Sequence, residues 1–457
     1  MTLGAYKQYL LFWQLYAVYL HAYKVHVFKK NRPRVYNGAL FQESMKVMLV
    51  VGQIFSLHPV SGISGKASNI RFKWKSWRCL YIILSMFGQF FLVIMCAYRM
   101  LKSKTSLDAG TPVIFYGTTC VTMAVFLKIA TQWPQLARHM ADTELLDPST
   151  DRAVIFKCNL TCVIAFVLSL IEHFLSLLSA VAGAKNCNPD YKGYESFVTH
   201  FYPWIFNYLP YSVYLGIFTQ FLHIQSTFIW NFSDLFLVCI SFYLTSRLQH
   251  VNKKLDKMQG KYLPEVSWKS VREDYCRVTD VVRRVDDVIN GITLICFANN
   301  LFFVCFQLFN TLEDGFKGSN RCPHNKNSSS STLLKGYDQA AYLVFSLIYL
   351  LSRSVAVSLI AAQVNTASMA PAPILYSVPS PVFCTEVQRF IDQVNSDNVA
   401  LTGLQFFSVT RGLLLTVSVS KFGLNINLVH FSPSSRENTR ASSDHGPIVS
   451  TANGMKW

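Results

Sequence analysis

Seven stretches of the chain are apolar over about 20 residues or more, and polar, charged segments separate them. They lie near 80–101, 111–131, 155–183, 207–245, 290–312, 338–363 and 400–419. An α-helix of about 20 residues crosses the ~30 Å hydrocarbon layer with its backbone groups bonded internally. The pattern therefore predicts an all-α, polytopic membrane protein with seven transmembrane helices.

Four stretches depart from a simple crossing. The stretch 207–245 exceeds one crossing, so we expect its helix to continue into water. The last is weak, because its apolar run stops near Val419 and residues 420–457 are polar and Ser-rich, which is typical of a disordered tail. Tyr9–Phe28 and the shorter segment 41–60, which ends at Pro59, are predicted to be interfacial or packed helices of a cytoplasmic region 1–79. If 41–60 crossed the membrane, the sidedness of every later segment would invert.

Lysine and arginine collect on one side of the predicted topology. They are frequent in 1–79 and 246–289 and sparse in the loops on the other side. The positive-inside rule places the N-terminus in the cytoplasm. Helices one to four (80–245) then form a ligand-binding bundle, 246–289 is a cytoplasmic helical anchor, and 290–419 holds helices five to seven. Asn327-Ser328-Ser329, a glycosylation acceptor, falls in the outer loop 313–337.

Composition supports a membrane as the solvent. The chain is 51% hydrophobic and 14% aromatic over 457 residues, too apolar for one soluble core and its polar covering. The net charge of +17 fits anionic lipid headgroups, because no nucleic-acid module is present. No enzyme motif, cofactor motif or metal site is found, and no CxxC pair occurs. Cys187 and Cys322 fall in predicted outer loops, and the sequence leaves open whether they form a disulfide.

Polar residues recur on one face of the fourth span. Gln220, His223, Thr227, Asn231 and Asp234 are three or four residues apart, so they share a helix face. A carboxylate in a span needs a partner or water. Two interpretations of Asp234 therefore stay open: a structural bond to a neighbouring helix, or a place in a wet ligand site.

The third span carries an adjacent acid and imidazole, Glu172 and His173. They either satisfy each other or line a polar cavity. The fifth and sixth spans also present amides and hydroxyls, and no unpaired Lys or Arg is evident in the outer halves of these spans. Such a lining suits a small, neutral, polyhydroxylated molecule such as a sugar. The candidate ligand residues are Glu172, His173, Trp230, Asn231, Asp234, Asn300, Gln307 and Tyr342.

Five sequence blocks resemble insect gustatory receptors of the sugar clade, in order, over roughly residues 40–417. They are FQESMKVMLVVGQIFSLHPVSGI, FKWKSWRCLY, QSTFIWNFSDLFLVCISFYLTSRLQHVN, LLSRSVAVSLIAAQVN and ILYSVPSPVFCTEVQRFIDQVNSDNVALTGLQFFSVTR. The resemblance implies a seven-helix subunit with a cytoplasmic N-terminus in a homo- or heterotetramer around a ligand-gated cation pore. It also implies a sugar held in the outer part of each helical bundle.

The end of the chain departs from that family. After TRGLLL at 410–415, family members carry a Thr-Tyr and then Gln-Phe signature in the last helix. Here the chain reads VSVSKFGLNINLVHFSPSSRENTR, with Lys421 where a pore helix stays apolar. We interpret the last helix as aberrant or truncated, and a gene model that reads past an exon boundary near Val417 would explain it.

The resulting hypothesis is a gustatory receptor subunit in the plasma membrane of taste neurons that acts as a sugar-gated, non-selective cation channel. Three alternatives remain: a seven-helix G-protein-coupled chemoreceptor, a sugar transporter and a non-conducting truncated subunit. The cytoplasmic N-terminus argues against the first alternative. The absence of an inverted internal repeat argues against the second.

Overall fold

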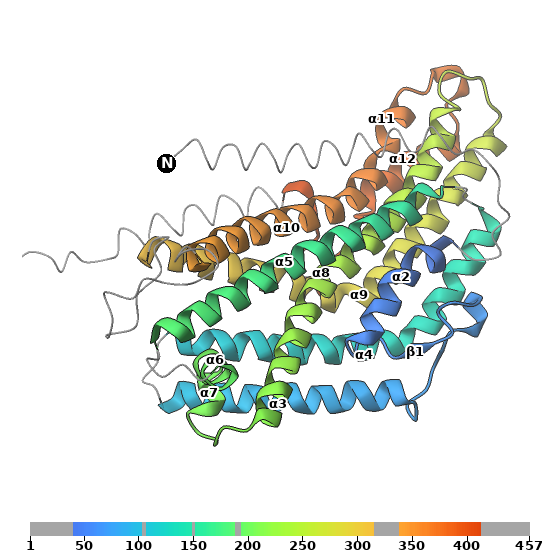
Figure 1. Cartoon of the computed structure of the whole chain (residues 1–457). Coiled ribbons are helices and arrows are strands. Elements are labelled where there is room, and N and C mark those ends of the chain that lie inside the picture. Colours follow the sequence, from blue (N-terminus) through green and yellow to red (C-terminus); the bar gives the residue numbers. More distant parts are fainter. Residues whose placement is uncertain (1–39, 103–106, 149–150, 188–192, 315–337, 413–457) are drawn as a thin grey trace, which may run out of the picture. The chain divides into compact units, whose positions relative to one another are not determined.

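The computed structural model describes residues 40–102, 107–148, 151–187, 193–314 and 338–412. Six helices in these ranges are long and apolar enough to cross a membrane. They are α3 (Trp77–Lys102), α4 (Leu107–Leu146), α5 (Ala153–Cys187), α8 (Val213–Asp256), α9 (Glu265–Asp314) and α10 (Asp338–Met369) (Figure 1). The first six predicted spans fall on these helices, which confirms a multi-pass helical membrane protein.

The shorter elements connect and flank the long helices. They are α2 (Leu40–Ile54), β1 (Val60–Ser61), η1 (Ala67–Asn69), β2 (Arg71–Phe72), α6 (Tyr194–Phe201), α7 (Pro203–Phe206), α11 (Pro371–Tyr376), η2 (Ser380–Val382) and α12 (Thr385–Ser396). The two strands pair antiparallel, with Val60 opposite Phe72. This short pair of strands departs from the all-α prediction.

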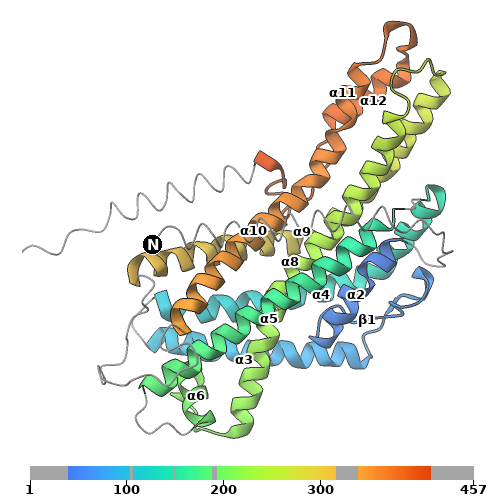
Figure 2. The ribbon, with the colours of Figure 1, turned by 45° about the horizontal axis from the view of Figure 1, so that its top comes forward.

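Helix α8 lies at the centre of the packing. In its most apolar stretch 83% of the residues are buried, against 17% for α5. It packs against α2, α4, α5, α9 and α10, and Figures 1 and 2 both show α5 and α10 beside it. Its rings extend the core, with Phe236 packed edge-on against Phe126 at 5.2 Å between ring centroids. A polar stripe on α8 therefore faces protein, as the sequence predicted.

The predicted extension of the fourth span is confirmed as helix. α8 runs without interruption through Asp256, and its 44 residues measure about 66 Å at 1.5 Å per residue. That length is about twice the hydrocarbon thickness. Part of the helix therefore lies beyond the apolar layer.

Segment 41–60 contains a short helix that packs against the long helices. α2 has 15 residues and ends at Ile54, which at about 22 Å is too short to span the layer. Its first turn is held by Glu144 on α4, which accepts hydrogen bonds from the backbone N–H of Leu40 at 2.6 Å and of Phe41 at 2.9 Å. Tyr243 of α8 donates a third, at 2.7 Å. A carboxylate from another helix thus caps α2.

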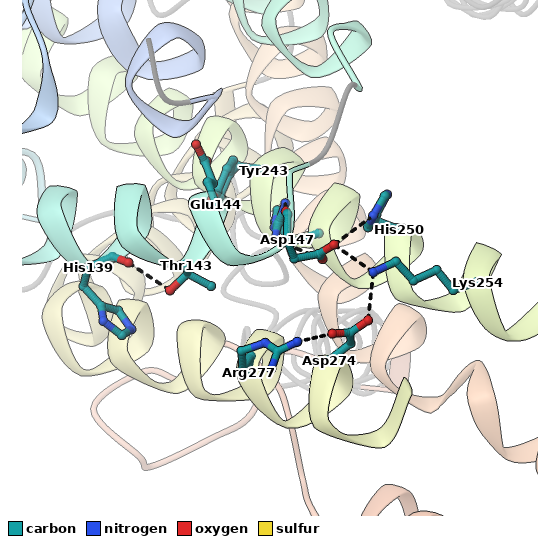
Figure 3. A network of polar contacts seen from close by, with 10 residues as sticks. His139, Thr143, Glu144, Asp147, Tyr243, His250, Lys254, Asp274 and Arg277 are labelled. Carbon is teal, nitrogen blue, oxygen red and sulfur yellow. Dashed lines mark hydrogen bonds and ion pairs between the residues drawn. The ribbon is translucent and has the colours of Figure 1, made fainter. Parts of the chain in front are cut away.

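A polar cluster joins the ends of α4, α8 and α9 (Figure 3). Asp147, just past α4, accepts from Lys254 at 2.8 Å and contacts Arg247 and His250 at 3.3 Å each. Lys254 also donates to Asp274 of α9 at 2.8 Å. Burial raises the pKa of the Asp147 carboxyl, but the hydrogen bond from Lys254 and the surrounding cations outweigh burial and hold it below its ordinary value.

The predicted seventh span, 400–419, is corrected over its first part. Residues 400–410 are not helical, and helix begins only at Arg411. The reason is a tertiary contact. Thr402 donates its backbone N–H and its hydroxyl to the carboxylate of Asp286 on α9, at 2.6 and 2.7 Å. Leu404 and Gln405 then take positive φ angles of 48° and 63° in a turn that no helix accommodates. The count of seven crossings stays a prediction.

Several sequence predictions fall outside the described residues. These are the helix Tyr9–Phe28, the glycosylation acceptor Asn327, the tail 420–457, and the side chains of Cys187 and Cys322.

Candidate ligand site between four helices

An ion pair lies at the centre of the polar layer formed by α8, α9 and α10. Asp234 of α8 is 2% exposed, and its Oδ2 lies 3.0 Å from Nε of Arg353 on α10. The Nδ2 of Asn300 on α9 lies 3.1 Å from both carboxylate oxygens. Asp234 therefore has the structural partner that one of the two sequence interpretations required.

Arg353 is held by more than its counter-ion. Its guanidinium donates to the side-chain oxygens of Asn231 and, at 3.3 Å, of Asn300. It also lies 4.3 Å from the ring centroid of Trp230, a cation–π geometry. The buried cation thus has a carboxylate, two amide acceptors and an aromatic face around it, which offset part of the cost of its burial.

Arg353 was missed as a site residue by the sequence reasoning. The signal was present, because an arginine inside an apolar span needs a partner and Asp234 was the most costly acid in the neighbouring spans. The two residues are separated by 119 positions in the chain. The sequence around Asp234 and the sequence around Arg353 do not indicate that the two residues pair.

Asn231 links α8 to α10 as well. Its Oδ1 accepts from the hydroxyl of Tyr349 at 3.0 Å, in addition to Arg353, and its Nδ2 donates to the backbone oxygen of Thr227 at 2.9 Å. The amide of Asn231 therefore joins α8 to α10 through hydrogen bonds within the protein. Asn231, Asp234 and Asn300, all predicted site residues, are brought together in this layer.

Glu172 of α5 occupies the edge of the layer. Its Oε1 accepts a hydrogen bond from Ser346 of α10 at 2.8 Å. The positive charge of Arg353 acts on it electrostatically. Glu172 is half-buried, so it is held less completely than Asp234.

His173 does not pair with Glu172. Its ring instead faces His223 of α8, at 6.2 Å between centroids. Among the described residues no hydrogen-bond partner meets its Nε2, whereas Nδ1 of His223 is bonded to the Tyr116 hydroxyl at 3.0 Å. Glu172 and His173 therefore meet different neighbours and do not satisfy each other, and their place in a polar cavity stays a prediction.

Gln307 lies apart from the ion pair. It is seven residues beyond Asn300 on α9, or about 10 Å along the helix axis. Its Nε2 donates to the backbone oxygen of Leu343 at 3.3 Å. The contact ties α9 to α10 at another level of the bundle.

A small cavity adjoins the ion-pair layer. Its volume is about 10 Å³, and it is lined by Phe115, Thr118, Thr119, Thr122, Ile229, Trp230, Asn299 and Phe303. The three threonines come from α4, which the sequence reasoning did not consider as a polar lining. Ligand pockets for small molecules typically measure roughly 300–1,000 Å³. The cavity has to widen before it holds a disaccharide.

Known proteins resemble this chain in sequence and fold. The family model described as "Trehalose receptor" matches residues 26–321 and 325–440. The gustatory receptor for sugar taste 64f of Drosophila melanogaster is 30% identical over 397 residues, covering 86% of this chain and 81% of that receptor. The fly's gustatory receptor 5a for trehalose is 31% identical over 407 residues, covering 88% and 87%.

A solved structure shares the fold. The insect olfactory receptor OR5 from Machilis hrabei matches with a TM-score of 0.61 at 14% sequence identity, over 84% of this chain and 97% of that one. Its complex with eugenol matches with a TM-score of 0.60. At this identity the likeness establishes the fold.

Proposed function

Because this chain belongs to the trehalose receptor family, the sugar-sensing gustatory receptors of insects, we propose that it is a sugar-gated cation-channel subunit of taste neurons. Membership in the family makes it a chemoreceptor and not an enzyme. The plasma membrane, a tetrameric assembly with itself or other gustatory receptors, and a cytoplasmic N-terminus are parts of the proposal.

The observation that carries the proposal is the polar and aromatic lining beside the ion pair. Sugars present hydroxyl groups for hydrogen bonds and an apolar ring face for stacking. Thr118, Thr119 and Asn299 offer the first kind of partner, and Trp230 offers the second. A relative is named for trehalose, so a disaccharide is the first ligand to test.

Gating follows from the size of the cavity. The cavity, at about 10 Å³, is too small for a disaccharide, so sugar binds the conformation in which the helices stand further apart. A ligand shifts a conformational equilibrium only by its difference in affinity between the two states. Trp230 lines the cavity and stacks on Arg353, so widening there also moves the ion pair that joins α8 to α10.

Glu172→Gln tests the ligand site. We expect trehalose binding to weaken about tenfold, because a hydrogen bond to a charged acceptor is worth about 1.5 kcal/mol and the change removes the charge but keeps the shape. Binding of radiolabelled trehalose to the purified chain in lipid nanodiscs measures the affinity, and the melting temperature should stay unchanged. Glu265→Gln, an exposed glutamate at the start of α9, is the matched control. Equal affinity in wild type and Glu172→Gln would remove Glu172 from the site.

Conduction is measured separately from binding. Whole-cell currents evoked by trehalose should appear when the residues after Val417 are replaced by a family ending with the Thr-Tyr and Gln-Phe signature. Binding without current in the natural chain identifies a non-conducting subunit. Failure to bind any sugar in either form contradicts the proposed function.

The proposed topology places Asn327 outside the cell. We expect the chain from insect cells to lose mass on treatment with an N-glycosidase and Asn327→Gln to abolish that loss. An N-terminal epitope tag should be stained only after the cells are permeabilised. Staining of intact cells would invert the orientation.

A further inference from the structure

One face of α3 is apolar and exposed along the whole helix. Its exposed members recur three, four or seven residues apart: Trp77, Leu80, Leu84, Phe87, Ile94, Tyr98 and Leu101. This spacing defines a single stripe on the helix surface. From Trp77 to Leu101 the stripe measures about 36 Å, close to the thickness of the hydrocarbon layer. A stripe of this length can reach from one membrane interface to the other.

The residues that lead into Trp77 are basic and aromatic. Arg71, Lys73 and Lys75 are exposed. Trp74, between the two lysines, is 61% exposed, and Trp77, the first residue of the stripe, is 85% exposed. No Asp or Glu occurs in the sequence between Glu43 and Asp108. Tryptophan settles at the headgroup level of a bilayer. Each basic side chain near an anionic membrane surface contributes an attraction to its lipids.

Hydrogen bonds hold the basic segment 71–75 against α2 and α3. Gln53 of α2 and Arg78 of α3 both donate to the backbone oxygen of Val60 in β1, each at 2.6 Å, and β1 pairs with β2, which contains Arg71. Tyr81 of α3 donates to the backbone oxygen of Ile54 at the end of α2, at 3.0 Å. Arg78 is therefore engaged within the protein, and Arg71, Lys73 and Lys75 are displayed outward from a fixed position.

We propose that Arg71, Lys73 and Lys75, together with Trp74 and Trp77, form a binding site for anionic phospholipid headgroups at the foot of α3. The three cations attract the phosphate and carboxylate groups, and the two indoles anchor the same surface at the interface. This site is independent of sugar binding and of conduction. With an N-terminus in the cytoplasm, it faces the leaflet in which anionic lipids are concentrated.

The experiment uses the purified full chain in liposomes whose lipid tails carry bromine, a contact quencher of tryptophan fluorescence. Brominated phosphatidylserine should quench the emission more strongly than brominated phosphatidylcholine. The substitution of both Trp74 and Trp77 by Phe should remove most of the difference, which assigns it to this surface. The triple variant Arg71→Gln, Lys73→Gln, Lys75→Gln should reduce the difference at least twofold.

The matched control is Lys253→Gln, Lys257→Gln, Lys261→Gln, which changes the net charge equally at exposed positions in the last turn of α8 and in the segment that follows it. It should leave the difference unchanged. An equal loss in the control would mean general charge attraction and would overturn the proposal. Equal quenching by both lipids would show an interfacial contact without headgroup preference and overturn it too. Quenching that survives the Phe substitutions would place the contact elsewhere, with this face covered by a second copy or exposed to water.

Discussion

Asp234→Ala is expected to remove most of the receptor from the cell surface, whether or not sugar is present. The change leaves Arg353, whose side chain is 10% exposed, without its counter-ion in the middle of the bundle. Removing one partner of a buried ion pair typically costs about 3–5 kcal/mol, a large share of the stability of a folded chain. Surface biotinylation against total protein measures the loss.

The double variant Asp234→Asn, Arg353→Gln separates charge from shape. It removes both charges and keeps polar groups of similar size, so we expect surface expression to recover most of the loss. Asp256→Ala, an exposed acid at the end of the same helix, should express as wild type. If Asp234→Ala alone reached the surface normally, Asp234 would not be the counter-ion that holds Arg353.

This expectation revises the role that the sequence assigned to Asp234. A polar stripe on α8 indicated that Asp234 faces protein or water, and the structure places it against protein. Sugar contact is then better sought at Trp230 and the threonines of α4, which line the cavity, and at Glu172, which is bonded to Ser346. The stripe ends in two residues, Asn231 and Asp234, that are buried against protein, but the pattern did not distinguish a connector from a ligand contact.

The fold could be predicted wherever the sequence of a single helix reflects the solvent around it. The apolar lengths located α3, α4, α5, α8, α9 and α10, because hydrocarbon imposes the same requirement on every crossing. The pattern failed at 400–410, where the residues are apolar enough for a span. There Thr402 bonds to Asp286, 116 residues earlier, and a turn replaces the helix.

The site was harder to predict because its partners are distant in the chain. The pairing of Asp234 with Arg353, and of Glu172 with Ser346, depends on how α5, α8 and α10 pack. Adjacent residues on one helix point about 100° apart, so Glu172 and His173 meet different neighbours. The periodicity of one helix shows which residues share a face. It does not show which other helix packs against that face.

Asp147→Asn is expected to lower the melting temperature of the purified chain by roughly 5 °C, from a loss of about 3 kcal/mol. Arg247 is 1% exposed and would lose its ionised partner, although its hydrogen bond to the backbone oxygen of residue 147 remains, at 3.0 Å. Lys254 would keep Asp274 alone. Asp280→Asn, which removes an exposed ion pair with Arg284, should change the melting temperature by less than about 1 °C.

We also expect the stability difference between wild type and Asp147→Asn to depend on pH. The pKa of Asp147 is lowered in the folded chain, so the folded state holds the carboxylate more strongly than the unfolded state does. The stability difference between wild type and Asp147→Asn should be complete above the ordinary aspartate pKa, near about 4. It should shrink as the pH falls through the lowered value, because protonation then makes the two side chains alike. A difference that stays constant down to the lowest pH tolerated by the protein would show that the charge of Asp147 does not hold α4, α8 and α9 together.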